Sequence, residues 1–378
     1  MKERGIERRD FLKAGAMLGA GIMAVGAFPA KGRAVSYTPM KYSDVLDMDH
    51  VAMAEASGQV MDSWRYRQET VTTIKNPMLR AGVQSIMENP APTIMENLGS
   101  TEKKEVYEEL SAKGMIDGLA YDDFLPPVSD PSRSPQPFYS APGSGYSSHH
   151  AYPGGVATHT ALNLRVSLAL YEGYRDTYDY LLDRDIVIAS QVLHDLHKAW
   201  VFQWQEDGSS RTEQKLAGTG EHHPLSVAES LHRGLPAAMC VAQACAHNHP
   251  GFEKDEAGPV NWISTAATIL GKDAAKEGWL AEDGKTLPQP RTMENFLCHL
   301  GDHDWVLTVP AAKWTIPLMQ EIAVQHYGVK ESELEGKKFN QLRNYVFSQA
   351  TIMSLYQQYV KEGKEGLART VLSIVSPA

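Results

Sequence analysis

Two histidines, an aspartate and a lysine lie close together in the stretch VLHDLHKAW, whose other residues are apolar. His194 and Asp195 are adjacent, and His197 and Lys198 follow them. The apolar flanks indicate a protein interior, where an ionisable group is costly unless it is paired or bound to a metal. We therefore expect a metal ion, or partners from elsewhere in the chain, to compensate these side chains.

The histidines of the chain are concentrated around this stretch. Ten of the 14 lie between residues 149 and 249, and none lies between 51 and 148. Imidazole suits Zn, Fe, Mn and Ni, and a carboxylate among the imidazoles can bridge two ions. The distribution favours a metal site over a set of separate core histidines bonded to backbone carbonyls. The ten are His149, His150, His159, His194, His197, His222, His223, His232, His247 and His249.

The adjacency of His194 and Asp195 sets a geometric condition. We expect residues 184–203 to form one helix, because apolar residues recur there at helical spacing. Neighbouring side chains on a helix point about 100° apart. A site built on this pair therefore needs partners from other helices.

Strand patterns are scarce, since no series of alternating β-branched runs joined by Asn-Gly or Asp-Gly turns is present. The sequence therefore predicts an all-α fold. Residues 41–120 read as several helices, one of them at 103–114 behind a Ser-Thr cap. Later helices are expected at 157–173, 184–203, 223–234, 236–249, 259–276 and 292–307, with two or three more over 316–378 and an excursion at 277–291.

The stretch 125–148 interrupts these helices. It holds six prolines with several serines and glycines, a composition that no helix interior tolerates. A connection this long inside a compact chain is often functional, and we expect it to wrap over a site. The chain then divides into a helical N-terminal region with this loop (35–140), a metal-binding core (141–310) and a C-terminal helical extension (311–378).

Five motifs in the core are similar to those of one family. HHAYPGGVATHT resembles an HHAYPGGLLEHT opening whose histidine, here His159, is a ligand. HDLHK matches an HDxxK signature, and EHHPLSVAESL resembles an HPxxGxxLL element that points to His223 rather than His222. CAHNHPGF lies where a histidine pair is found, and HLGDHDW resembles the closing helix. Through these motifs, residues 145–307 resemble the HD-domain superfamily of metal-dependent phosphohydrolases, in its binuclear form.

The resemblance implies an HD-type five-helix core that holds two divalent metal ions, with Asp195 between them. Fe or Mn is the expected metal, with Zn and Ni as further candidates. Separations of 35 residues from His159 to His194 and 28 from Asp195 to His223 each leave room for one helix and a connection. The implied ligands are His159, His194, Asp195, His223, His247 and Asp302.

The chain departs from the family pattern at three places. The histidine pair is split as His247-Asn248-His249, so either histidine is a candidate ligand, and the spacing favours His247. His197 stands where the signature usually has glycine, which brings an additional imidazole near the metals. The stretch from His249 to Asp302 is longer than a minimal core requires, and Asp304 is the alternative ligand if the register differs.

The resemblance also implies a reaction. Two ions would supply a bridging hydroxide as the nucleophile that cleaves a phosphoester, with Asp195 as a catalytic residue between them. Lys198 would stabilise the charge on the phosphate. His197 would protonate the leaving oxygen or orient a ligand. Lys198, His150 and Tyr152 are the expected substrate contacts.

Two other functions remain open on the sequence. Some HD proteins with a binuclear set are mixed-valent di-iron oxygenases, and the same lysine occurs in them, so Lys198 does not discriminate. A binding module that keeps the site without turnover is the third interpretation. The primary expectation is a hydrolase acting on a small-molecule phosphoester or a nucleotide.

Residues 1–34 are different in character from the rest. Arg8–Arg9, followed by Phe11, Leu12 and Lys13 and a Gly/Ala-rich apolar run, closely resembles a twin-arginine export signal. Cleavage is expected near Gly32-Arg33-Ala34, with cleavage after Ala27 or retention as an anchor as alternatives. We therefore expect the twin-arginine machinery as a partner and a periplasmic or extracellular location. That route exports folded proteins, which suits a metalloprotein.

The charge of the chain bears on its substrates. Residues 1–34 carry seven Lys/Arg and three Asp/Glu, or +4, so their removal changes the net charge from −10 to −14. An acidic protein gains nothing from counterion release on nucleic acid, which favours a small substrate. No later segment is apolar enough to predict a membrane helix. Cys240 and Cys245 are expected to be buried thiols rather than a disulfide.

Overall fold

Helices dominate the computed structural model, which describes residues 37–96, 98–126, 135–146 and 148–377. The strands in these ranges are two residues long, so the prediction of an all-α fold is confirmed. Pro39–Ala378 forms one compact unit. The twin-arginine segment lies outside the described residues, and its prediction stays a prediction.

The N-terminal region consists of short helices with clear start signals. The side chain of Ser57 accepts a hydrogen bond from the backbone N–H of Val60, and Asn76 caps the next helix immediately before Pro77, as is usual at helix starts. β1 (Met40–Lys41) pairs in parallel with β4 (Val375–Ser376) and joins the two ends of this unit. The helices are α2 (Tyr42–Asp47), α3 (His50–Glu55), α4 (Gly58–Thr72), α5 (Pro77–Glu88) and α6 (Ser100–Ala112).

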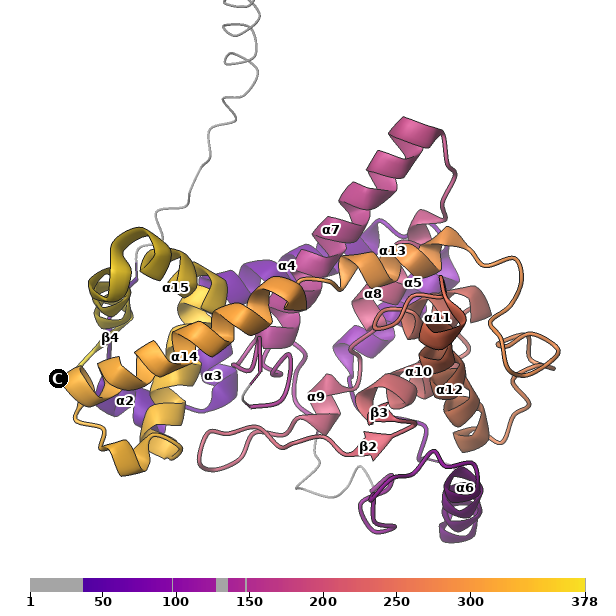
Figure 1. Ribbon diagram of the computed structural model, residues 1–378, viewed down its shortest axis with the longest axis horizontal. Helices are drawn as coiled ribbons and strands as arrows, with labels where there is room; N and C mark the ends of the chain where they lie inside the picture. Colours follow the sequence, from indigo (N-terminus) through magenta and orange to yellow (C-terminus); the bar gives the residue numbers. More distant parts are fainter. Residues whose placement is uncertain (1–36, 97, 127–134, 147, 378) are drawn as a thin grey trace, which may run out of the picture. The chain divides into compact units, whose positions relative to one another are not determined.

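Five helices surround the candidate site. α7 packs against α4, α8 and α13, and α11 packs against α8, α10 and α13. α7 begins after Gly154, whose φ of 91° requires glycine, and a Cβ there would collide with the side chain of Val60. The five are α7 (Gly155–Tyr178), α8 (Arg184–Leu193), α10 (His222–His232), α11 (Ala237–Ala244) and α13 (Met293–Gly301) (Figure 1).

The expectation of one helix over 184–203 is wrong. α8 ends at Leu193, and a separate short helix, α9 (Lys198–Val201), follows. Between them, the N–H groups of Leu196 and Lys198 bond to the carbonyls three residues earlier, at 3.0 and 3.1 Å. These tight turns change the chain direction at the His194–Asp195 pair, so the two side chains need not diverge as they would on a helix.

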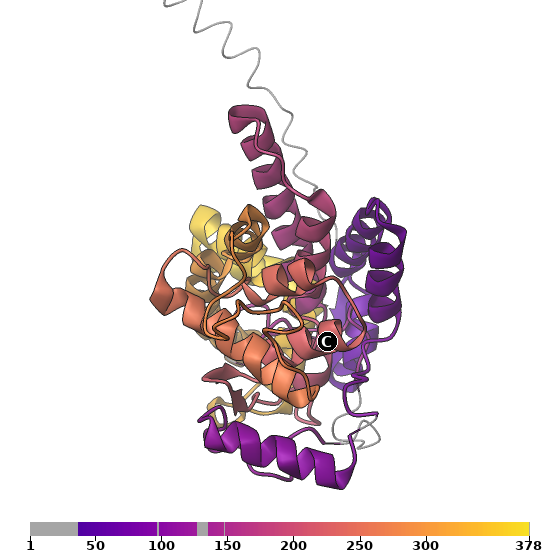
Figure 2. The ribbon, with the colours of Figure 1, turned by 90° about the vertical axis from the view of Figure 1, so that its right-hand side faces the viewer.

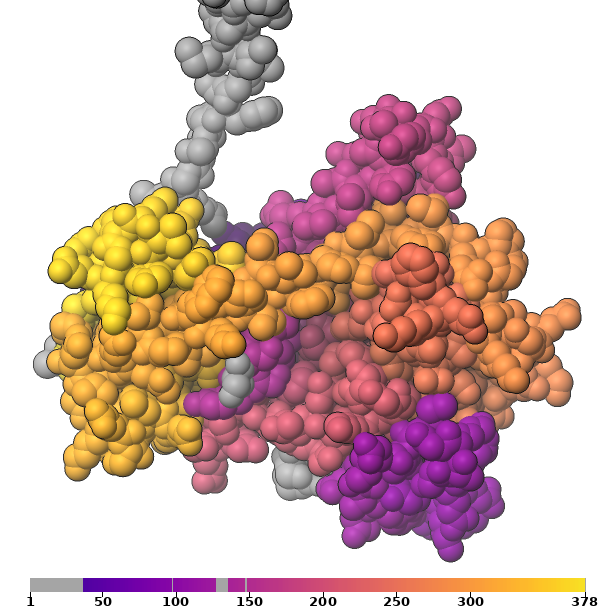
Figure 3. Space-filling model, viewed as in Figure 1, coloured from indigo at the N-terminus to yellow at the C-terminus, as the bar shows by residue number. Residues whose placement is uncertain are grey.

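The remaining helices pack around this core. α6 lies against α12 (Figure 2). α14 packs against α15, and in the space-filling view the two form the adjoining orange and yellow surface (Figure 3). The expected helix 292–307 is interrupted near Asp302, and 236–249 ends early at Ala244. The elements are α12 (Glu253–Ile269), α14 (Trp305–Tyr327), a 3₁₀ turn (Glu331–Glu333), α15 (Lys337–Ile374), β2 (Lys215–Leu216) and β3 (Thr219–Gly220).

The main hydrophobic core lies between α5, α8, α10, α11 and α12. Trp200 is completely buried in it, and Cys240 and Cys245 are buried free thiols, as expected. Among the described helices, none combines the length with the apolar character that crossing a bilayer demands.

Candidate metal centre

Four of the predicted ligands form one buried group, which we call the first group. His159 projects from the second turn of α7, His194 and Asp195 follow the end of α8, and Asp302 follows the end of α13. The Nε2 atom of His159 lies 3.0 Å from Oδ1 of Asp302 and 3.3 Å from Oδ2 of Asp195. The Nε2 atom of His194 lies 3.3 and 3.2 Å from the same two oxygens. Side chains on α7 and just after the ends of α8 and α13 therefore converge on one point.

Three histidines form a second group beside the first. His222 and His223 open α10, and His247 follows the end of α11; their ring nitrogens approach within 4.8 Å of one another. The free oxygen of Asp195, Oδ1, lies 3.6 Å from Nε2 of His222 and 3.7 Å from Nε2 of His247. Asp195 therefore faces both groups, one through each carboxylate oxygen, as a bridging ligand must.

The sequence pointed to His223 rather than His222, and the structure brings both into the second group. Nδ1 of His222 lies 2.5 Å from Glu213 Oε2, which leaves its Nε2 directed at Asp195. Nδ1 of His223 bonds with the hydroxyl of Thr219 at 2.9 Å, and its ring lies 3.9 Å from that of His247. A carboxylate on the far nitrogen of a histidine is a common support for a metal ligand.

The two histidines of the split pair lie in different surroundings. His247 approaches two carboxylates of the first group, with its Nε2 3.7 Å from Oδ1 of Asp195 and 3.5 Å from Oδ2 of Asp302. His249 lies outside both groups, where its Nε2 is 3.6 Å from Asp255 and its ring contacts Phe252. The geometry thus favours His247 as the ligand.

The chemistry of these donors fits divalent cations. Nε2 of His194, Oδ1 of Asp195 and Nε2 of His222 are buried without a well-formed hydrogen bond among the described residues. Buried polar atoms are rarely left in this state, and here they converge. Nδ1 of His194 lies 2.8 Å from the carbonyl of Gln191, which fixes the ring and directs the lone pair of Nε2 into the site.

The electrostatics of the first group also favour a cation. Despite burial, His194 and other neighbouring cationic groups hold the pKa values of Asp195 and Asp302 well below their usual range. Burial opposes the charged form of His194, but Asp195 and Asp302 outweigh it and raise the pKa of that imidazole to about 9. The carboxylates therefore attract positive charge, which a metal ion can supply in place of protons.

A cavity of about 340 Å³ opens onto both groups. Lys198 lies on its wall, where its ammonium donates a 2.7 Å hydrogen bond to the carbonyl of Gly143 and lies 2.7 Å from Asp195 Oδ2. The part of the expected loop that the structure describes does border the site, through Ser144, Gly145 and Ser148. Phe202 and Trp305 add apolar wall area.

His194 and Asp195 lie behind the residues that line this cavity, and three further predicted residues, His197, His150 and Tyr152, lie outside both the lining and the two donor groups. His197 is buried on another side of its turn, with its Nε2 4.0 Å from Glu229 and its backbone N–H bonded to Ser226. The rotation of the tight turn directs it there, so the geometry gives no support for a leaving-group acid. His150 and Tyr152 are buried behind His159 and bond to each other at 3.2 Å, rather than facing the cavity as substrate contacts.

Sequence reasoning missed His149 and Glu213 near the site and placed a third residue, Asp304, differently. His149, next to the predicted His150, lines the cavity instead. Glu213, which supports His222, lies in a loop without a motif that could have identified it. Asp304, the alternative ligand, lies on the far side of His159 and faces His150 at 2.8 Å.

Comparisons with known proteins give one distant relationship. The chain is 29% identical over 99 residues to a dihydroneopterin 2',3'-cyclic phosphate phosphodiesterase of Methanocaldococcus jannaschii. This stretch covers 26% of the chain and 39% of the relative, so well under half of that protein is matched. No family model and no solved structure matches the chain. The chain is thus distantly similar to a phosphodiesterase and contains His/Asp groups suited to metal ions.

Proposed function

We propose that this chain is an HD-type, metal-dependent phosphohydrolase that cleaves a small-molecule phosphoester. The observation that carries the proposal is the position of Asp195, whose two oxygens face two separate groups of metal-ligand donors while Lys198 lies beside it. The distant similarity to a phosphodiesterase supports the same reaction class. The ligands proposed are His159, His194, Asp195, Asp302, His247 and one or both of His222 and His223.

Residues of the chain have separate roles in the proposed hydrolysis. Divalent ions, when bound, supply a water of lowered pKa and neutralise charge on the phosphoryl oxygens. Lys198 adds a fixed cation at the cavity wall, aimed by the carbonyl of Gly143, where charge develops on the phosphate. Phe202 and Trp305 give the cavity an apolar wall against which the organic part of a substrate can pack. Glu213 and Asp195 contact the two ring nitrogens of His222 and so fix the orientation of this ring in the second group.

The cavity indicates a small substrate. Its volume of about 340 Å³ is near the lower end for ligand pockets, which suits a phosphodiester or monoester of nucleotide size or below. The relative is named for a cyclic phosphate, and we extend this to propose that a cyclic phosphodiester is among the substrates of this chain.

Hydrolysis assays on the purified, metal-analysed protein test the proposal. The substrates are bis(p-nitrophenyl) phosphate, p-nitrophenyl phosphate and a 2',3'-cyclic nucleotide, each assayed with Fe(II), Mn(II) and Zn(II). We expect metal-dependent hydrolysis that Asp195→Asn reduces at least a hundredfold. The matched control is Asp179→Asn, an exposed aspartate beyond the end of α7 with φ of 50°, which asparagine also adopts.

Hydrolysis that is insensitive to chelation, or equal in Asp195→Asn and Asp179→Asn, would contradict the proposal. Substrate-dependent oxygen consumption without phosphoester cleavage, together with a mixed-valent di-iron resonance, would replace it with the oxygenase function. Full metal loading with neither activity would favour a binding module.

We also propose export by the twin-arginine route, which rests on the sequence of residues 1–34 alone. Lysine cannot reproduce the planar, forked donors of arginine. Replacement of Arg8 and Arg9 by lysine should therefore retain the protein in the cytoplasm, whereas the unchanged chain should appear in the periplasmic fraction. Equal fractionation of the two would overturn this part of the proposal.

A further inference from the structure

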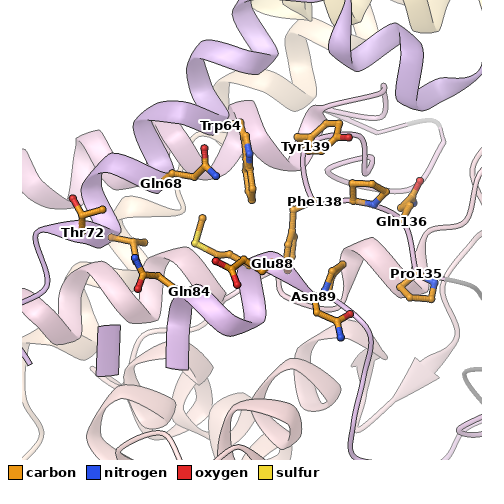
Figure 4. Close-up of a pocket in the computed structure, with 14 residues that line it drawn as sticks. Trp64, Gln68, Thr72, Gln84, Glu88, Asn89, Pro135, Gln136, Phe138 and Tyr139 are labelled. Atoms are coloured by element: carbon orange, nitrogen blue, oxygen red, sulfur yellow. The ribbon is translucent and has the colours of Figure 1, made fainter. Parts of the chain in front are cut away.

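A second cavity, larger than the one at the metal centre, has no role in the proposed reaction. It measures about 600 Å³ and lies between α4, α5 and the segment 135–139. This volume is in the range of small-molecule sites. Figure 4 shows side chains from both helices and from the segment arranged around one space.

Aromatic rings form one wall of this cavity. The rings of Trp64 and Phe138 lie 6.4 Å apart and are inclined by only 21°, and the ring of Tyr139 lies 6.1 Å from Trp64. Trp64 and Tyr139 are partly exposed, whereas Phe138 is buried. Such surfaces bind flat ligands by stacking, at a low entropic cost.

The polar groups of the cavity are donors and acceptors without partners. Gln68 and Gln84 lie on α4 and α5, and Glu88 ends α5. Gln68 and Glu88 are exposed and Gln84 is partly exposed, and among the described residues their side chains form no hydrogen bond or ion pair that would have to break when a ligand binds. Glu88 is the one acidic side chain on the described lining, which holds no lysine, arginine or histidine, so a ligand that covers it replaces its water best by offering N–H or O–H donors.

The charges around the cavity favour a neutral ligand, because Glu88 would repel an anion and Arg67, behind the aromatic wall, would repel a cation. A phosphate or carboxylate would meet Glu88 without a compensating lysine or arginine on the described lining. A cation is also disfavoured, because the buried guanidinium of Arg67 already lies 5.4 Å from the ring centre of Trp64 and 4.9 Å from that of Phe138. Arg67 is fixed there by a 2.7 Å hydrogen bond to the carbonyl of Val192. The remaining choice is a neutral ligand.

We propose that this cavity binds a neutral, planar nitrogen heterocycle with adjacent N–H donors along one edge, the arrangement that guanine carries. The ring would stack on Trp64, and its N–H edge would pair with the carboxylate of Glu88. A carboxylate accepts two parallel N–H bonds in this geometry. The amides of Gln68 and Gln84 would bond with the ring's remaining donors and acceptors.

The cavity shares a chain segment with the metal centre. Residues 135–139 line the larger cavity, and Ser144, Gly145 and His149 line the cavity at the metal centre. Gln136 donates from its side chain to the carbonyl of Phe202 at 2.6 Å, and Phe202 also lines the metal cavity. A ligand bound in the larger cavity should therefore alter the rate of hydrolysis at the metal centre. This consequence rests on the proposed function.

Calorimetric titration of the full chain with guanosine tests the binding, in chelator-treated and in metal-loaded protein. We expect the same affinity in both, since the site is separate from the metals. Trp64→Ala and Glu88→Gln should each weaken guanosine binding at least tenfold, while Glu69→Gln, an exposed acid on α4 outside the lining, should not. Inosine, which lacks the 2-amino group, and adenosine should bind progressively more weakly.

Three results would overturn the binding site. The first is the absence of any heat of binding up to millimolar guanosine, and the second is equal binding by wild type and both lining variants. The third is binding that is lost on metal removal, because this would place the nucleoside in the cavity at the metal centre. Thermal melts of the variants establish that they are folded. Because binding is measured without turnover, this test fails or succeeds independently of the hydrolase assay.

Regulation is tested in the hydrolase assay with saturating guanosine. We expect the rate to change at least twofold at constant metal content, Glu88→Gln to abolish the change, and Glu69→Gln, outside the lining, to keep both the basal rate and the change. An unchanged rate despite binding would overturn the coupling between the two cavities.

Discussion

Asp304 lies behind His159, with its Oδ1 3.2 Å from Nδ1 of the imidazole, while Nε2 of the same ring faces Asp302 at 3.0 Å. The imidazole of His159 therefore lies between the carboxylates of Asp302 and Asp304, which are two residues apart in one turn. The second oxygen of Asp304 lies 2.8 Å from His150, and His150 contacts Tyr152. The residues that the sequence predicted as a spare ligand and as substrate contacts thus form a support for His159.

Replacement of Asp304 by asparagine should weaken metal binding without removing a ligand. A carboxylate on the far nitrogen of a histidine ligand raises its basicity and fixes its orientation, and its loss typically costs 10–100-fold in metal affinity. We expect a decrease of this size in competition with a chromogenic chelator. Asp179→Asn, at the exposed end of α7, is the control and should match wild type. Equal affinities for both variants would contradict the supporting role.

The two histidines of the split pair provide a matched test of the second group. His247→Asn should lower the metal content of the purified protein by about one ion per chain, because the second group loses a donor that faces Asp195 and Asp302. His249→Asn should leave the metal content unchanged, since His249 faces Asp255 instead. Elemental analysis after identical purification measures both. A loss in His249→Asn alone would reverse the assignment.

The fold class and the position of the site could be predicted from the sequence, because they depend on patterns that extend over many residues. Helical periodicity and the absence of strand patterns predicted the all-α fold. The motifs that resemble those of the HD superfamily pointed to donors that the structure brings together in overlapping groups that could hold a metal ion. Each of these residues lies on a helix or at a helix end, so an error of a few residues in a boundary does not change the expectation.

The directions of individual side chains could not be predicted. Apolar periodicity continues from α8 into α9, so the sequence gives no sign of the tight turns that separate Leu193 from Lys198. Those turns decide that His197 faces Glu229 and not the cavity. Similarly, His149 and His150 are adjacent, and the backbone alone determines which of them lines the cavity; His150 has φ of 53°, an unusual value that no motif encodes.

Lys198 should contribute to turnover more than to metal binding. Its ammonium is bonded to the Gly143 carbonyl and lies beside Asp195, where it can act on a bound phosphoester. Lys198→Met, which keeps the length of the side chain, should lower kcat by about 10²–10³-fold, the effect expected for loss of one preorganised charge. Metal content measured in parallel should stay within twofold of wild type. A proportional loss of metal and activity would instead assign Lys198 to holding the site together.

Stability in mildly acidic solution should depend on His50, which is remote in sequence from the metal ligands. Its ring stacks on Trp204 at 4.3 Å, and burial lowers its pKa from 6.5 to about 4. The unfolded chain then binds a proton between about pH 6.5 and 4 that the folded chain does not. This contribution to stability is complete above pH 6.5 and is lost as the pH falls toward 4.

His50→Phe keeps a ring against Trp204 and removes the titrating group. Denaturant unfolding between pH 7 and 4 should therefore show a shallower acid-side decrease in the free energy of unfolding for this variant than for wild type. The difference in slope should approach at most about 1.4 kcal/mol per pH unit, the value for one proton. His326→Phe, an exposed histidine near the end of α14, should retain the wild-type slope. Identical slopes for all three proteins would show that His50 titrates alike in the folded and unfolded chains.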